Sequence, residues 1–97
     1  MARKQYLICY DIADDKRLRK VFKKMNGYGE HLQYSVFQCE LSDKERAQMV
    51  AELNPLINHR EDQILVFSLG LAESYNAGAT LAIGRPYVFV ERHAVVV

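Results

Sequence analysis

The sequence has few of the residues that mark several large classes of protein. It contains no tryptophan, two prolines, three scattered histidines and two cysteines, Cys9 and Cys39. Both cysteines lie in apolar runs, which is typical of reduced core thiols and excludes a disulfide-rich scaffold. The histidine and cysteine positions show no zinc-ligand spacing. No apolar run approaches the roughly 18 residues of a membrane span, so we expect a cytoplasmic protein without a membrane partner.

Positive and negative residues nearly balance over the whole chain, with 13 lysines and arginines against 12 aspartates and glutamates. The net charge is +1, so any affinity for nucleic acid must come from an uneven distribution of charge. With 97 residues, of which 49% are hydrophobic, the chain is long enough for a single globular domain, which we assign to residues 1–97. A domain this small has a modest core, and its surplus of apolar residues hints at a dimer.

The first third of the chain predicts a strand followed by a helix. Tyr6–Asp11 is short, apolar and typical of a buried strand. Asp14 is a good helix N-cap. The helix should end at Asn26-Gly27, with Gly27 in the left-handed conformation that glycine tolerates. Its buried side would carry four apolar residues at helical spacing: Leu18, Val21, Phe22 and Met25.

The middle of the chain predicts one or two strands and a second helix. The residues between Tyr28 and Leu41 are typical of strands, and they fit either one long strand or two short ones with a reversal near Gln33–Ser35. Ser42-Asp-Lys-Glu45 is a capping box that should start a helix. Pro55 should end or kink this helix.

The last third predicts further strands. Ile64–Leu69 is an apolar strand, and Leu71–Gly78 is a loop by its small and polar composition. Thr80–Ile83 and Tyr87–Val90 should be short strands around a turn. The apolar run Ala94–Val97 would leave an exposed strand edge on a monomer, so we expect it to extend the sheet of a partner chain in a homodimer.

This order of elements favours an α+β fold. One antiparallel sheet would carry both helices on a single face. The commonest such topology is the ferredoxin-like sandwich, which requires two strands between Tyr28 and Leu41. An extra C-terminal strand would then pair with the dimer partner.

Asp11 is the first candidate functional residue, because a carboxylate ends a strand that is otherwise apolar. One interpretation is a turn residue that accepts hydrogen bonds from local backbone amides. Alternatively it is a ligand for a hard metal ion or a general base. One carboxylate is a poor site for Mg²⁺, and a two-fold dimer would supply the second.

The helix that follows Asp11 is strongly basic. Its cations are not interleaved with acids, which is more one-sided than most solvated helix faces. Helical geometry places Arg17 and Arg19 on either side of the buried stripe, with the lysines directed to solvent. The predicted nucleic-acid contacts are Lys16, Arg17, Arg19, Lys20, Lys23 and Lys24.

Taken together, these segments resemble the CRISPR-associated protein 2 family, the small adaptation protein of CRISPR systems. The resemblance rests on Y-D-I at Tyr10–Ile12, D-D-K-R-L-R-K-V at Asp14–Val21, and Y-G-E-H-L-Q-Y-S-V-F-Q-C-E-L at Tyr28–Leu41. It also includes an acidic residue, Asp62, before the next strand. Gln38 departs from the family pattern, in which many members carry glutamate.

The resemblance implies a ferredoxin-like homodimer that acts as a metal-dependent nuclease on RNA or DNA, with Mg²⁺ or Mn²⁺ as cofactor. It also implies a role in spacer acquisition, as a dimeric scaffold between duplex DNA and the CRISPR integrase. Asp11 would be the metal ligand and would face its own copy across the dimer. The other positions that the family links to activity or nucleic-acid contact are Tyr10, Arg17, Arg19 and Phe37.

Two other functions fit parts of the sequence. One is a ribonuclease toxin of similar fold, and the other is a regulatory ferredoxin-like domain without enzymatic activity. A regulatory domain would need a ligand pocket rather than a basic helix.

Overall fold

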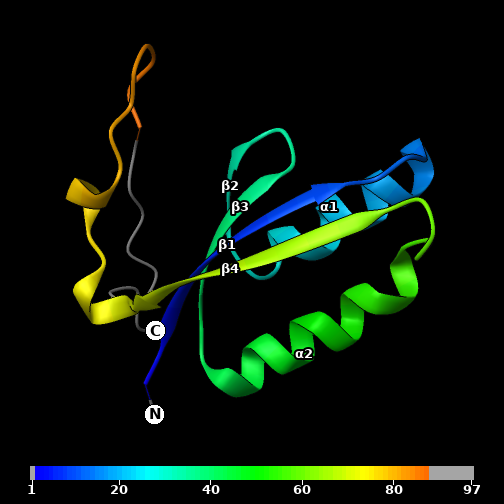
Figure 1. Cartoon of the computed structure of the whole chain (residues 1–97), viewed down its shortest axis with the longest axis horizontal. Helices are drawn as coiled ribbons and strands as arrows, with labels where there is room; N and C mark the ends of the chain where they lie inside the picture. The colour runs from blue at the N-terminus through cyan, green and yellow to red at the C-terminus, as the bar shows by residue number, and fades with distance from the viewer. Residues whose placement is uncertain (1, 88–97) are drawn as a thin grey trace.

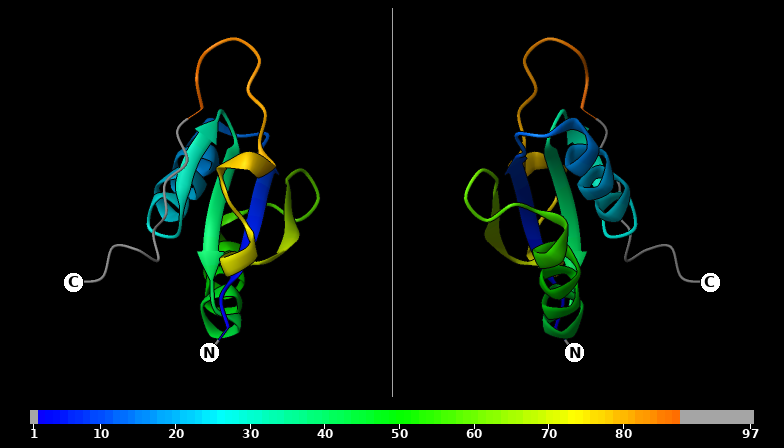
Figure 2. Two further views of the ribbon diagram at one scale, coloured as in Figure 1. Left: turned by 90° about the vertical axis from the view of Figure 1, so that its left-hand side faces the viewer. Right: turned by 90° about the vertical axis from the view of Figure 1, so that its right-hand side faces the viewer.

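The computed structural model describes residues 2–87. In this part of the chain four strands form one antiparallel sheet in the order β2-β3-β1-β4: β1 (Lys4–Asp11), β2 (Glu30–Gln33), β3 (Val36–Leu41) and β4 (Gln63–Leu71). Helices α1 (Asp15–Asn26) and α2 (Asp43–Leu53) cover one face of the sheet (Figures 1 and 2). The predicted ferredoxin-like sandwich is therefore confirmed. None of the helices in residues 2–87 has the length and apolar character needed to cross a membrane.

The hydrophobic core lies between the sheet and the two helices. Alternate residues of a strand face opposite sides of the sheet, so Tyr6, Ile8 and Tyr10 of β1 are buried beneath the helices. β3, α1 and α2 complete the core with Val21, Met25, Phe37, Cys39, Leu41, Met49 and Leu53. Burial of each large apolar side chain contributes about 1.5–3 kcal/mol, which holds the helices against this face.

The helix starts follow the predicted capping residues. The Asp14 carboxylate accepts a hydrogen bond from the Arg17 amide at 2.9 Å, and α1 begins at the next residue after Asp14. Both bonds of the capping box join Ser42 and Glu45 at the start of α2. α2 ends at Leu53, and residues Asn54–Leu56 form a 3₁₀ turn that contains Pro55.

The predicted cap at the end of α1 is wrong in its conformation. Gly27 has φ −78°, in the right-handed helical region, so no left-handed cap is present there. Glycine is instead required at Gly29, where a Cβ atom would collide with the Gln38 carbonyl oxygen and with Cys39 Sγ. Close approach of the chain to β3, rather than a helix cap, is the constraint at this end of α1.

The segment between Tyr28 and Leu41 contains two strands. β2 and β3 form a hairpin whose turn is Tyr34-Ser35, and Tyr34 adopts φ 28°. The Tyr10 amide donates to the Ser35 carbonyl oxygen at 3.0 Å, so the turn is tied to β1. The sequence left the choice between one strand and two open, and the hairpin decides it.

The predicted strand at Thr80–Ile83 is wrong. After β4 the chain makes two short 3₁₀ turns, Ala72–Ser74 and Ala77–Ala79, and then runs without regular structure to Tyr87. Leu81 and Ile83 are 86% and 94% exposed, and no strand among residues 2–87 pairs with them. The predictions for Val88–Val90 and Ala94–Val97 lie outside the described residues.

Asp62, just before β4, joins three parts of the chain. Its fully buried side chain accepts hydrogen bonds from Arg17 Nε at 2.8 Å and from the amides of Ala13 and Asn58 at 2.9 and 2.8 Å. Arg17 also contacts Glu61 at 3.0 Å on the solvent side. The Arg17 guanidinium holds the pKa of Asp62 well below its usual range, and the two amides act in the same direction.

We expect Asp62→Asn to lower the melting temperature by several degrees at neutral pH. The folded protein lowers the pKa of this carboxyl, so its contribution to stability is complete above the unfolded-state pKa of about 4 and falls as pH drops below it. The difference in melting temperature between wild type and variant should therefore shrink below about pH 4.

Thermal melts monitored by circular dichroism between neutral and acidic pH would measure this difference. Glu61→Gln is the matched control, because Glu61 contacts the same arginine but its side chain is 58% exposed. A difference for Asp62→Asn that stays constant with pH would contradict the prediction.

Candidate metal and nucleic-acid site

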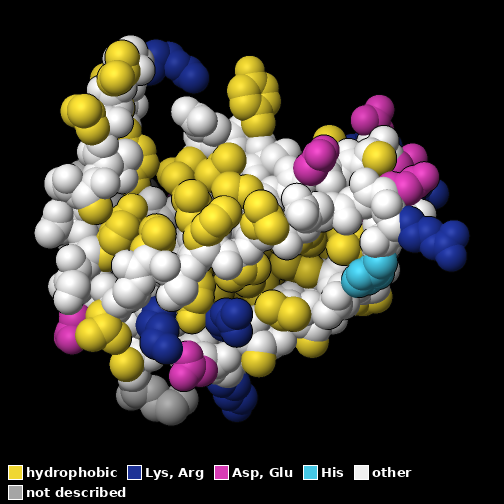
Figure 3. Space-filling view, in the orientation of Figure 1, with side chains coloured by type: hydrophobic (Ala, Val, Ile, Leu, Met, Phe, Trp, Pro, Cys, Tyr) yellow, Lys and Arg dark blue, Asp and Glu magenta, His cyan; other side chains and the backbone are white. Residues whose placement is uncertain are grey.

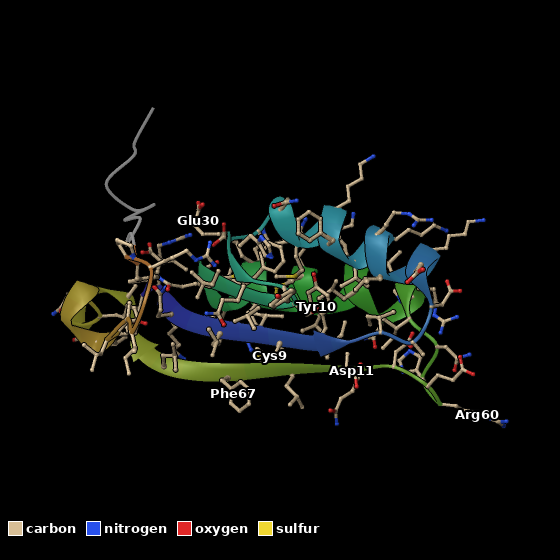
Figure 4. The ribbon with its side chains drawn as sticks, turned by 90° about the horizontal axis from the view of Figure 1, so that it is seen from above. Cys9, Tyr10, Asp11, Glu30, Arg60 and Phe67 are labelled. Atoms are coloured by element: carbon tan, nitrogen blue, oxygen red, sulfur yellow. The ribbon has the colours of Figure 1, made fainter. Side chains whose placement is uncertain are left out.

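Asp11 ends β1 on the sheet face that the helices leave uncovered. It lies opposite Gln63 of β4, and it shares its face with Cys9 and Phe67, whereas Tyr10 points toward the helices (Figure 4). Asp11 is exposed. Among residues 2–87 its carboxylate has no hydrogen-bond or ion-pair partner, so the turn-capping interpretation finds no support there. A carboxylate in this state is available to a ligand from solution.

A single chain offers few ligands for a metal ion at this position. In the described part of the chain no three His, Cys, Asp or Glu side chains gather closely enough to hold one. Mg²⁺ accepts one or two carboxylates and completes its octahedron with water and substrate oxygens. The carboxylate of Asp11 fits that chemistry as one ligand.

The uncovered sheet face is strongly apolar. Three apolar side chains of β4 are exposed on this face: Leu65 is 42% exposed, Phe67 47% and Leu69 40%. Leu7, Cys9 and Val36 lie beside them on the neighbouring strands. Figure 3 shows hydrophobic side chains gathered across this face. We call these six residues the open apolar face, and Asp11 lies at its border.

Tyr10 and Phe37 lie on the opposite side of the sheet from Asp11. Phe37 is fully buried and Tyr10 is 6% exposed. Their rings are stacked with centroids 6.2 Å apart, and burial raises the pKa of the Tyr10 phenol. The structure therefore brings these two predicted site residues together but separates both from Asp11. Any influence of Phe37 on the chemistry would pass through packing.

The two predicted arginines have different surroundings. Arg17 is held by Asp62 and Glu61, and these acids raise its pKa further. Through Asp62, its side chain stabilises the loop that follows Asp11, and it is not free for a ligand. Arg19 is exposed on the other side of the buried stripe and has no acidic partner in residues 2–87. It faces the hairpin turn and lines a hollow together with Tyr10.

The lysines of α1 also divide into two groups. Lys16, Lys20 and Lys23 are exposed and form no ion pair within the described residues. Lys24 lies 3.6 Å from Glu52 of α2. Glu52 also accepts a bond from the Tyr28 hydroxyl at 2.7 Å, and burial together with this bond raises the pKa of Tyr28 to about 12. The free cations of the helix are therefore Lys16, Arg19, Lys20 and Lys23.

Two features of this site were missed by the interpretation of the sequence. The acid partners of Arg17 lie 44 and 45 residues away, so helical spacing gave no signal for them. The open apolar face had a signal, because the apolar run in β4 continues through both faces of the strand. Such a run predicts burial on both sides, and among residues 2–87 the helices cover only one.

The comparison with family models identifies one family. The model for CRISPR associated protein Cas2 matches residues 4–76. A protein named CRISPR-associated endoribonuclease Cas2 1, from Rhodospirillum rubrum, is 42% identical over 96 residues, covering 99% of this chain and 93% of that protein. CRISPR-associated endoribonuclease Cas2 of Geobacter sulfurreducens is 40% identical over 92 residues, covering 95% and 96%.

Solved structures are similar as well. The crystal structure of Streptococcus pyogenes Cas2 aligns with a TM-score of 0.72 at 28% identity, over 82% of this chain and 99% of that one. A chain of a partial Cas6-RT-Cas1–Cas2 complex aligns with a TM-score of 0.62 at 25% identity, over 91% and 99%. The motifs, the fold and these matches agree, and this chain belongs to the CRISPR-associated protein Cas2 family.

Proposed function

We propose that this chain acts in spacer acquisition as a symmetric homodimer that binds duplex nucleic acid beside the CRISPR integrase and cleaves phosphodiesters with a divalent metal at Asp11. The observation that carries the proposal is the unpartnered Asp11 carboxylate at the border of the open apolar face. The likeness to a chain of a Cas1–Cas2 complex supports the integrase partner. The reduced state expected of Cys9 and Cys39, which lie in apolar strands, favours the cytoplasm.

The open apolar face supports the homodimer. An exposed apolar sheet face is unusual in a monomer and marks an interface. A two-fold axis through this face would bury Phe67 and its neighbours from both chains and bring the two copies of Asp11 toward one another. The apolar run Ala94–Val97 would add a strand to the partner's sheet.

Phe67→Glu should convert the dimer to a monomer at micromolar concentration. The variant places a charge in an apolar interface that would otherwise exclude water, and burying an unpaired charge is costly. Analytical ultracentrifugation measures the outcome. Ala51→Glu on the exposed side of α2 adds the same charge away from the sheet and should leave the mass unchanged. A wild type that sediments as a monomer would refute the proposed dimer.

The free cations of α1 support binding to the phosphate backbone. Lys16, Lys20 and Lys23 are exposed and lie on one helix without acidic partners among residues 2–87. Flexible lysines neutralise phosphates but read no bases, so we expect little sequence preference. Affinity should fall steeply with salt as condensed counterions are released.

Reversing these three lysines to glutamate should flatten the salt dependence of duplex binding. If each contacts one phosphate, the slope of log affinity against log salt should fall by about 2.7, at ~0.9 per phosphate. Fluorescence anisotropy at several salt concentrations measures the slope. Reversal of Lys44, Arg46 and Arg60 changes the net charge equally on other surfaces, and should leave the slope nearly unchanged. An unaltered slope in the α1 variant would show that these lysines do not contact the duplex and that it binds another surface.

Catalysis would depend on the paired Asp11 carboxylates. A divalent cation, when bound, stabilises the negative charge that develops on the phosphodiester and acidifies water. Asp11 would hold the cation, and Gln63 beside it offers a further oxygen on the same face. The free cations of α1 would hold the phosphate backbone during the reaction. Arg17 and Asp62 would keep the loop after Asp11 in place.

Asp11→Asn should lower metal-dependent cleavage by about a hundredfold or more, since even residues that only support a metal ligand are worth 10–100-fold. Purified protein with labelled RNA or duplex DNA and Mg²⁺ or Mn²⁺ measures the rate. Asp15→Asn removes an exposed carboxylate on the helix side and is the matched control. Equal rates of cleavage by wild type and Asp11→Asn would show that Asp11 has no role in catalysis.

A purely architectural role is the second candidate, favoured by the presence of a single unpartnered carboxylate at the site in each chain. In that case neither wild type nor Asp11→Asn would cleave, while both would retain duplex binding.

A further inference from the structure

Tyr34 combines backbone strain with exposure. It is the one non-glycine residue of the described chain with a positive φ, at 28°, and it occupies the β2–β3 turn. A bulky side chain is rare in this region, and such outliers gather at functional sites. The residue is 94% exposed. Contacts of the tyrosine ring with residues 2–87 therefore do not explain why a tyrosine occupies this turn.

A hollow of about 520 Å³ lies beside this turn. Its lining consists of Tyr10, Leu18, Arg19, Phe22, Tyr34 and Ser35. The size falls within the roughly 300–1,000 Å³ of small-ligand sites, and the lining shares their mostly aromatic and aliphatic character. Arg19 is the charged residue of this lining and has no acidic partner in residues 2–87. The hollow can therefore take a flat apolar group that carries a negative charge beside it.

The walls of the hollow are held in place. Phe22 packs edge-on against His31, with ring centroids 5.0 Å apart, and against Phe37 at 5.6 Å. His31 Nε2 lies 2.6 Å from the Tyr34 carbonyl oxygen. This contact joins the strained turn to the same aromatic group. The hydrogen bond from the Tyr10 amide to the Ser35 carbonyl oxygen ties the turn to β1 as well. Packing and hydrogen bonds therefore fix the Phe22 wall and the backbone of the turn, while the exposed side chains of Arg19 and Tyr34 border the hollow.

We propose that this hollow binds an unpaired nucleobase, with Tyr34 stacking on its face and Arg19 contacting its phosphate. This inference rests on the proposed nucleic-acid binding of α1. Lys16, Lys20 and Lys23 lie on the same helix as Arg19, so a strand held by them would pass the hollow. Phosphate contacts alone would not need an apolar cavity, whereas an unstacked base does.

Two duplexes test the proposal, one blunt and one carrying a short thymidine overhang. Stacking on one aromatic side chain is worth about 1–3 kcal/mol per base, so the overhang should raise the affinity of wild type about tenfold. Tyr34→Phe should keep this gain because it keeps the ring. Tyr34→Asn should lose the gain while binding the blunt duplex as wild type does. Asparagine tolerates the left-handed conformation, so this variant removes the ring without adding strain.

A 2-aminopurine at the first unpaired position gives a direct readout. Stacking should quench its fluorescence in complexes with wild type and with Tyr34→Phe, but not with Tyr34→Asn. Failure of wild type to bind the blunt duplex would count against the proposed function itself. The base site is overturned if blunt binding is normal and the overhang gives no gain, or if Tyr34→Asn retains the gain.

A protein occupant would give a different pattern. If Tyr34→Asn abolished binding of the integrase while wild type showed no preference for the overhang, the hollow would receive a protein side chain, and the nucleobase proposal would be wrong.

Discussion

The strict alternation of side chains along β1 places neighbouring residues on opposite faces of the sheet. Tyr10 enters the core beneath the helices, and Asp11 emerges on the open apolar face. A one-residue shift of register would exchange the two faces, so the buried set of β1 also determines where Asp11 lies. Chemistry that needs Asp11 is thereby directed away from the helices and toward whatever covers the open apolar face.

Electrostatic interactions divide the basic residues between support of the fold and availability to ligands. Arg17 satisfies the buried Asp62 carboxylate, which in turn ties the loop after Asp11 to the start of β4. Removing Arg17 would leave the buried Asp62 carboxylate without its counter-charge, and this makes the pair structurally important. Arg19, two residues along the helix, points away from these acids and keeps its charge free beside the hairpin. The two arginines of one motif therefore have different roles.

The starts of both helices were predicted well, because their causes are local. The capping box at Ser42 and the N-cap at Asp14 specify helix starts through bonds spanning three residues, and both are present. The family resemblance implied a ferredoxin-like fold, as did the order of elements, and it added Tyr10 and Phe37 to the candidate residues. The strand expected at Thr80–Ile83 is absent, because a strand needs a neighbour to accept its hydrogen bonds and residues 2–87 of this chain provide none there.

The sequence by itself determined the alternation of strands and helices, the apolar stripes that pack them and the concentration of positive charge on α1, since each follows from residue type at a fixed period. Only the tertiary structure decided which cations stay free, because Arg17 meets an acid 45 residues away. It also decided that Asp11 lies on the sheet face away from the helices and that Tyr34 adjoins an apolar hollow. Those arrangements depend on distant segments packing together, which no local pattern encodes.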